Sequence, residues 1–136
     1  MEFDLKVGMT GRKQELVTAD NTAIKYGSGS VAVYATPAMV GLMEGACIDA
    51  VDAHLPAGMG TVGTALNIKH TAATPVGMTA SAEAELIEID GKRLVFRVTA
   101  FDEQGEIGAG THERFIISVE KFLAKADAKK AQFVKS

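Results

Sequence analysis

The spacing of hydrophobic residues changes once along this sequence. Between residues 36 and 54, apolar side chains recur at about 100° per residue, the period of a helix buried along one side. This stripe consists of Val40, Met43, Cys47, Val51 and Leu55. From Thr61 onward the period falls to two, which is typical of strands. The pattern predicts one long core helix followed by a sheet.

The predicted helix has a clear start and one polar residue out of place. Thr36 followed by Pro37 is a start signal, because a hydroxyl can cap free N–H groups and an early proline loses no hydrogen bond. Asp49 and Asp52 fall on the far side of the helix, but Glu44 projects within the apolar stripe. A carboxylate there is costly to bury without a partner, so Glu44 is a candidate functional residue.

Strands are predicted before and after this helix. Their ranges are Lys13 to Val17, Thr61 to His70, Thr79 to Ile89, Arg93 to Phe101 and Glu106 to Glu120. Asp90-Gly91 is a hairpin signal, and the change of parity near Leu86-Ile87 predicts a bulge. Residues 1–11 are expected to be an irregular lead-in, 18–30 a flexible loop, and 121–130 a short amphipathic helix.

The order strand, long helix and four-strand antiparallel meander indicates an α+β fold. Other α+β layouts share this composition, but a buried helix early and meandering strands late are typical of the hotdog fold, a curved antiparallel sheet wrapped around one long central helix. Such a sheet covers the helix on one side only. We therefore expect a homodimer, or a dimer of dimers.

Composition limits the classes of function. With 136 residues, 47% hydrophobic and 23% charged, residues 1–136 fit a single globular domain. A net charge of -3 gives no general attraction to nucleic acid or to an anionic membrane. Cys47 lies on the apolar stripe and is expected to be an inert core residue. Without a secretory or membrane-spanning apolar run, a cytoplasmic protein is expected, and nothing predicts a cofactor or metal.

Several spaced motifs resemble the hotdog thioesterases of the fluoroacetyl-coenzyme A thioesterase type. They are Gly41-Leu42-Met43-Glu44, Ala46-Cys47, Gly63-Thr64-Ala65, His70-Thr71-Ala72-Ala73-Thr74-Pro75, Glu106-Ile107-Gly108, Gly110-Thr111-His112-Glu113-Arg114 and Glu120-Lys121-Phe122. The resemblance spans residues 35–125 and implies hydrolysis of an acyl-coenzyme A (acyl-CoA) thioester by a homodimer. It further implies that Thr36, Glu44 and His70 are catalytic and that Gly63 and Arg114 line the substrate site.

The chemistry of the three catalytic candidates can be considered separately. Glu44, desolvated among apolar side chains, should be a strong base for activating water, or else form a structural ion pair with Arg114. His70 shares a strand face with the core, where it could orient Glu44, shuttle a proton, or simply end the strand. Thr36 could cap the helix or bind the acyl oxygen. Eight helical steps put Thr36 about 12 Å from Glu44, so substrate would lie between them unless a partner subunit closes the gap.

The remaining candidates have weaker signals. Gly63 could allow close approach of a ligand or mark a bulge, and Arg114 could face coenzyme A or solvent. His54 and His112 are interpreted as structural. Four lysines near the C-terminus could hold phosphate, although a solvated helix face is the favoured interpretation. These are Lys121, Lys125, Lys129 and Lys130.

The sequence departs from the fluoroacetyl-specific enzyme where substrate is chosen. Gly27-Ser28-Gly29-Ser30 stands where that enzyme has bulky apolar lid residues, so better turnover of ordinary short or medium acyl groups is expected. Two other functions remain open. One is a hydratase or dehydratase on the same fold, and the other is a non-catalytic acyl-CoA-binding protein.

Overall fold

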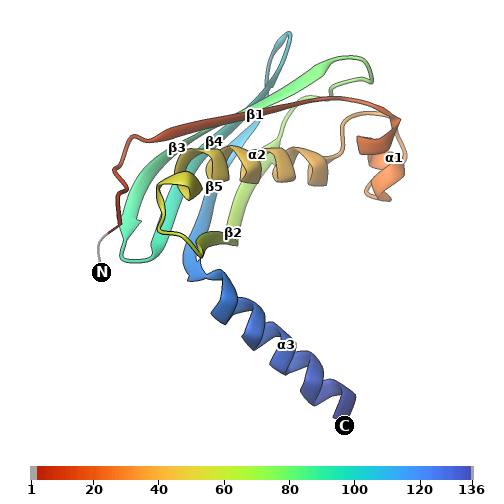
Figure 1. Ribbon diagram of the computed structural model, residues 1–136. Coiled ribbons are helices and arrows are strands. Elements are labelled where there is room, and N and C mark those ends of the chain that lie inside the picture. Colours follow the sequence, from red (N-terminus) through yellow and green to blue (C-terminus); the bar gives the residue numbers. More distant parts are fainter. Residues whose placement is uncertain (1–2, 136) are drawn as a thin grey trace.

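The computed structural model describes residues 3–135 and contains five strands and three α-helices within that range (Figure 1). The strands are β1 (Thr10–Leu16), β2 (Met59–His70), β3 (Thr79–Asp90), β4 (Arg93–Asp102) and β5 (Gly105–Ser118). The α-helices are α1 (Ala23–Tyr26), α2 (Thr36–Val51) and α3 (Val119–Lys135), and short 3₁₀ turns span Ala19–Asn21 and Asp52–His54. No helix in residues 3–135 is both long and apolar enough to cross a membrane.

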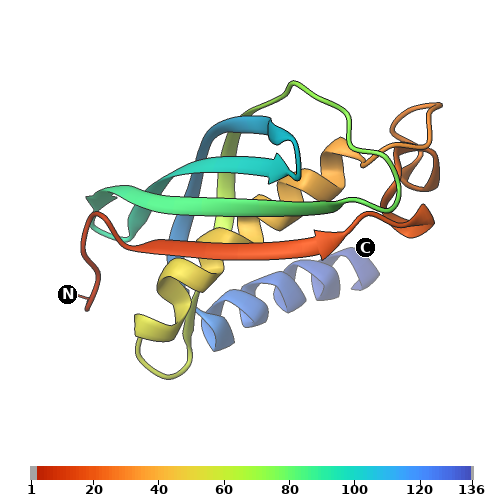
Figure 2. The same cartoon turned by 90° about the horizontal axis from the view of Figure 1, so that it is seen from above.

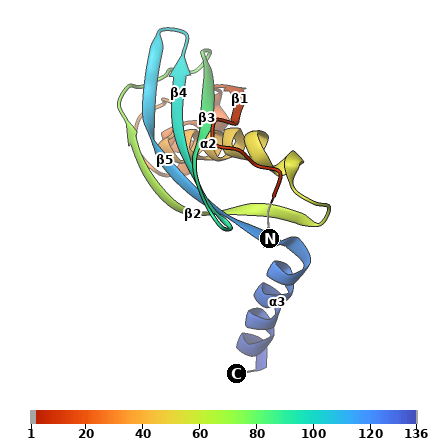
Figure 3. The ribbon, with the colours of Figure 1, turned by 90° about the vertical axis from the view of Figure 1, so that its left-hand side faces the viewer.

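The strands form one curved antiparallel sheet in the order β1-β3-β4-β5-β2. Helix α2 lies in the concave side of this sheet, whereas α3 extends away from it (Figures 2 and 3). This arrangement is the predicted hotdog fold. The predicted four-strand meander is wrong in one respect, because β2 pairs with β5 and not with β3. Tight hairpin turns join β3 to β4 and β4 to β5. The connection from β2 to β3 is longer, so β2 can lie at the edge of the sheet opposite β1.

The core is formed where α2 packs against the sheet. Met43, Cys47 and Val51 of the predicted stripe are buried, while Val40 and Leu55 are only half-buried. The buried surface of α2 is wider than predicted and also includes Ala38, Met39, Leu42, Ala46 and Ala50. The sheet curves around the helix and therefore covers more than a single stripe.

Several local predictions are confirmed, and some boundaries move. The pairing of β3 with β4 shifts register between Leu86 and Glu88, which is the predicted bulge, and Gly91 has a positive φ of 62° in the predicted hairpin turn. Strand β1 begins at Thr10, inside the expected lead-in, of which Met1 and Glu2 lie outside the described residues. The expected flexible loop contains α1, which Thr22 caps, and α3 is longer than predicted.

Candidate active site

The first cluster of candidate residues joins the start of α2 to the end of β2. Thr36 is the first residue of α2, and the N-cap position belongs to Ala35, which makes no side-chain cap. The Thr36 hydroxyl instead lies 2.7 Å from Nδ1 of His70. The expectation that Thr36 caps the helix is therefore wrong, because its side chain is engaged by a histidine from the sheet.

His70 has the predicted orientation but a different partner from the one expected. Its cross-strand neighbour is Gly108, and its side chain lies on the face of the sheet that holds α2. Burial lowers the pKa of His70, and the backbone of Ala72 opposes this shift in part. The imidazole is therefore neutral near pH 7. Its Nε2 is buried and has no hydrogen-bond partner within residues 3–135, which leaves one polar atom available to a ligand or a second chain.

A pocket of about 300 Å³ opens beside this pair. Its walls come from the segment before α2 and from the segment that follows β2. The lining residues are Ala23, Ser28, Gly29, Val31, Val33, Tyr34, Thr36, His70, Thr71, Ala72 and Ala73. The pocket is therefore mixed: the Thr36 hydroxyl and the His70 imidazole line it together with apolar side chains such as Val31 and Val33 and with the polar residues Ser28 and Thr71.

The second cluster surrounds Glu44, farther along α2. Oε2 of Glu44 lies 3.5 Å from Nη1 of Arg114 and 3.9 Å from Nε2 of His112. The ion pair with Arg114 was one of the two expectations for Glu44. The expected desolvation is wrong, because the Glu44 side chain is 37% exposed. The carboxylate faces β2 beside Gly63, where no side chain covers it.

Gly63 allows this approach. A Cβ atom built on Gly63 would lie 2.8 Å from Oε2 of Glu44 and 3.0 Å from Cε1 of His112. The β2–β5 pairing also shifts register between Gly63 and Ala65, so the glycine marks a bulge as well. The expected bulge is confirmed, whereas the group that comes close to Gly63 within this chain is the Glu44 carboxylate, and approach of a ligand stays a prediction.

Arg114 is buried and holds the second cluster together. It is 4% exposed, and its guanidinium donates to the side-chain and backbone oxygens of Thr61, each at 2.8 Å. Thr61 in turn donates to Asp52 at 2.7 Å. The expectation that Arg114 is solvated is therefore wrong, and its contact with coenzyme A stays a prediction. Within this chain, Arg114 pairs with Glu44 and holds Thr61.

His112 is a site residue that the sequence interpretation missed. Burial lowers its pKa, and the charge of Arg114 adds to that shift, so the ring is neutral near pH 7. A neutral ring fits its contacts, since Nδ1 can donate to the carbonyl of Ala65 at 2.8 Å while Nε2 accepts from Arg114 at 3.1 Å. His112 and Arg114 are two residues apart on β5, so their side chains lie on the same face of the sheet. This spacing could have indicated from the sequence that His112 lies near Arg114.

The two clusters are separate within one chain. Thr36 and Glu44 are eight residues apart on one regular helix, a rise of about 12 Å. His70 contacts Thr36, and the histidine beside Glu44 is His112. Beyond Glu44 on the same helix, Cys47 is buried and its pKa is raised to about 12 by burial, in line with the expected inert thiol. Within residues 3–135, no three metal-ligating side chains gather.

Comparison with known proteins identifies the family. Residues 17–120 match the model of the fluoroacetyl-CoA-specific thioesterase family. The chain belongs to this family. A fluoroacetyl-CoA thioesterase from Streptantibioticus cattleyicolor is 53% identical over 97 residues, which span 71% of this chain and 70% of that protein.

Solved structures agree with this assignment to the fluoroacetyl-CoA-specific thioesterase family. A structure of the fluoroacetyl-CoA thioesterase FlK has 43% sequence identity and a TM-score of 0.86, covering 92% of this chain and 97% of that chain. A thioesterase superfamily member from Thermus thermophilus has 27% identity and a TM-score of 0.88, covering 96% and 97% of the two chains. The resemblance noted in the motifs is confirmed by the family match and by the FlK structure, and the Thermus thermophilus structure supports the fold and the thioesterase superfamily.

Proposed function

We propose that this protein hydrolyses acyl-CoA thioesters with short or medium acyl groups, using Thr36, His70 and Glu44. The observation that carries the proposal is the Thr36–His70 hydrogen bond beside a pocket of about 300 Å³, with Nε2 of His70 buried and without a hydrogen-bond partner among residues 3–135. Family membership supports the reaction class, and a FlK mutant with 42% identity to this chain has been solved in complex with acetyl-CoA.

In this proposal the thioester carbonyl lies at the start of α2. The free N–H groups of the first helical turn and the helix dipole stabilise the negative charge that develops on the acyl oxygen. The Thr36 hydroxyl, held by His70, contributes a further polar contact at the same oxygen. The acyl chain extends between apolar walls that include Val31 and Val33.

Glu44 supplies the base. Its carboxylate accepts a proton from water while the water oxygen attacks the carbonyl carbon, and the tetrahedral intermediate collapses by breaking the C–S bond. The departing coenzyme A thiolate takes up the proton, so the products are the free acid and the thiol. This requires Glu44 to lie near the bound thioester at Thr36 and His70, which the 12 Å rise along α2 opposes within one chain.

A second copy of the chain would remove this difficulty. Strand β2 is at the edge of the sheet, and residues 63–67 in its middle are exposed. Antiparallel pairing of two β2 strands about a two-fold axis, with Gly63 opposite the partner's His70, would place each Glu44 beside the other chain's Thr36–His70 pair. With Nδ1 of His70 donating to Thr36, the unpartnered Nε2 could accept a hydrogen bond from the water that the partner's Glu44 activates. We therefore propose a homodimer with two shared sites.

The reaction is tested by measuring thiol release with a thiol reagent over acyl-CoA esters of increasing chain length. Wild-type protein should release thiol from short and medium esters, and Glu44→Gln should abolish release. Glu106→Gln is the matched control, because Glu106 is exposed in the β4–β5 turn region and should retain full activity. Thr36→Ala with full activity would remove Thr36 from the mechanism.

Two other results would overturn the proposal. A change in absorbance of an enoyl thioester without thiol release would indicate a hydratase, and tight acyl-CoA binding without either reaction would indicate a binding protein.

The shared site has its own test. Glu44→Gln and His70→Ala proteins, each inactive alone, are mixed under conditions that exchange subunits. If sites are shared, half of the dimers are hybrids with one intact site of two, and activity returns to about one quarter of the wild-type value. No recovery despite proven exchange would show that each site lies within one chain.

A further inference from the structure

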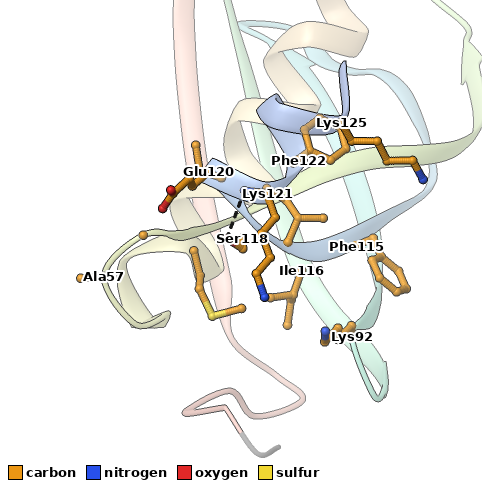
Figure 4. Close-up of a pocket in the computed structure, with 13 residues that line it drawn as sticks. Ala57, Lys92, Phe115, Ile116, Ser118, Glu120, Lys121, Phe122 and Lys125 are labelled. Atoms are coloured by element: carbon orange, nitrogen blue, oxygen red, sulfur yellow. Dashed lines mark hydrogen bonds between the residues drawn. The ribbon is translucent and has the colours of Figure 1, made fainter. Parts of the chain in front are cut away.

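A second pocket lies away from Thr36, where α3 leaves β5. It has a volume of about 910 Å³ and is formed by the end of β5, the start of α3, the segment before β2 and the β3–β4 turn. Figure 4 shows its side chains, with Phe115 and Ile116 from β5, Lys92 from the β3–β4 turn, and Lys121, Phe122 and Lys125 from α3.

Three lysines and two phenylalanines give this pocket its chemistry. Lys92, Lys121 and Lys125 all line it, and none of them pairs with a carboxylate in residues 3–135. Among the residues that line the pocket, Glu120 is the acidic one. Its side chain extends away from the three lysines (Figure 4). On a protein of net charge -3, this local excess of unpaired cations favours an anionic ligand.

The aromatic rings narrow the class of ligand. Phe115 is 42% exposed and Phe122 is 45% exposed, and both line the pocket. Exposed aromatic faces bind planar bases by stacking, and ammonium groups beside them bind phosphate. The combination fits a phosphorylated adenosine better than a free inorganic anion, which would gain nothing from the rings.

The distance to Glu44 agrees with a coenzyme A ester. Met59 of the pocket and Gly63 beside Glu44 are four residues apart on β2, about 13 Å along the strand. The pantetheine arm of coenzyme A has about the length of four extended residues, also about 13 Å. A nucleotide in the pocket would therefore leave its thioester within reach of the carboxylate.

We propose that the pocket formed by Lys92, Lys121, Lys125, Phe115 and Phe122 binds the phosphorylated adenosine end of the coenzyme A ester. This inference rests on the proposed function, because it assumes an acyl-CoA substrate. It also assigns the lysines at the start of α3 to phosphate binding, where the sequence favoured a solvated helix face.

The kinetic test compares the best acyl-CoA ester with the matching acyl-pantetheine, which lacks the nucleotide. Lys121→Ala/Lys125→Ala should raise KM for the acyl-CoA ester about 10-fold or more and leave kcat and the KM for acyl-pantetheine unchanged. Lys130→Ala is the matched control, because Lys130 is exposed on the same helix and does not line the pocket. Equal KM values for the wild type and the double variant would overturn the nucleotide site and leave the hydrolase intact.

A binding measurement separates this site from the reaction. Calorimetry with adenosine 3′,5′-bisphosphate should show binding to the wild type that the double variant loses, and weaker or no binding of inorganic phosphate. Such binding by a protein that hydrolyses no thioester would refute the proposed function and support the nucleotide site. Absence of binding to the wild type would overturn the site, whatever the protein hydrolyses.

Discussion

Adding one methyl group at Gly63 should lower activity without unfolding the protein. The new Cβ would lie 2.8 Å from Oε2 of Glu44, whereas ordinary contacts begin at 3.4 Å. The carboxylate would have to move by the difference, about 0.6 Å. His112 cannot give way as easily, because Ala65 and Arg114 hold both of its ring nitrogens.

The expected loss follows from this displacement. Misplacing a catalytic group by about 1 Å can cost about 100-fold in rate, so Gly63→Ala should lower kcat/KM by about 10- to 100-fold, or about 1.4–2.7 kcal/mol. Stability should fall by about 1–3 kcal/mol, because the new Cβ would also lie 3.0 Å from Cε1 of the firmly held His112, but two effects limit the loss. The Glu44 side chain is partly exposed and can swing outward, and alanine in a strand recovers about 0.5–1 kcal/mol relative to glycine.

The assay pairs thiol release with thermal unfolding followed by circular dichroism. Gly60→Ala is the matched control on the same strand, because its Cβ would meet Asp52 Oδ2 at 3.5 Å and Val119 Cγ2 at 3.7 Å, both ordinary contacts. It should keep activity. If Gly63→Ala is as active as the wild type, the position of the Glu44 carboxylate against Gly63 does not matter for the reaction, and the role of Glu44 as base is refuted.

Three further predictions concern the core of the site. Arg114→Met should lower the free energy of unfolding by about 2–4 kcal/mol in urea titrations, because Glu44, His112 and Thr61 lose a shared donor; an unchanged midpoint would contradict this. The folded-state pKa values of His70 and His112 are lowered, so the unfolded chain binds more protons, and stability should fall as pH drops below about 6.5. Unfolding at pH 7.5 and 5.5 checks the sign, and equal stability would contradict it. The buried Cys47 should react with a thiol reagent only after denaturation, and rapid labelling of the native protein would disprove its inertness.

The elements that could be predicted from the sequence are those that depend on local chemistry. Asp90-Gly91 marks its hairpin because both residues tolerate the turn conformation, and the parity change at Leu86 requires a bulge wherever the strand pairs. The position of β2 in the sheet could not be predicted in this way. Its connection to β3 has no tight turn, so nothing local indicates that its partner is β5.

The same distinction applies to the site. The opposite charges of Glu44 and Arg114 suggested their pairing, but the hydrogen bond from Thr36 to His70 joins residues 34 positions apart and depends on where β2 ends over α2. The exposure of Glu44 depends on Gly63, which only the register of β2 with β5 brings opposite Arg114. Periodicity places side chains on a face, but cross-strand register decides which of them meet.

The geometry of β2 and α2 explains why two clusters exist instead of one. Gly63 and His70 are seven residues apart on β2, about 23 Å of strand, whereas the residues of α2 that they approach are separated by about 12 Å of helix. The helix therefore cannot follow the strand along its whole length. Leu66, which shares the inner face with His112, remains 48% exposed between the clusters. An apolar side chain left bare on the inner face of an edge strand is where we expect substrate, or the second chain that completes the site.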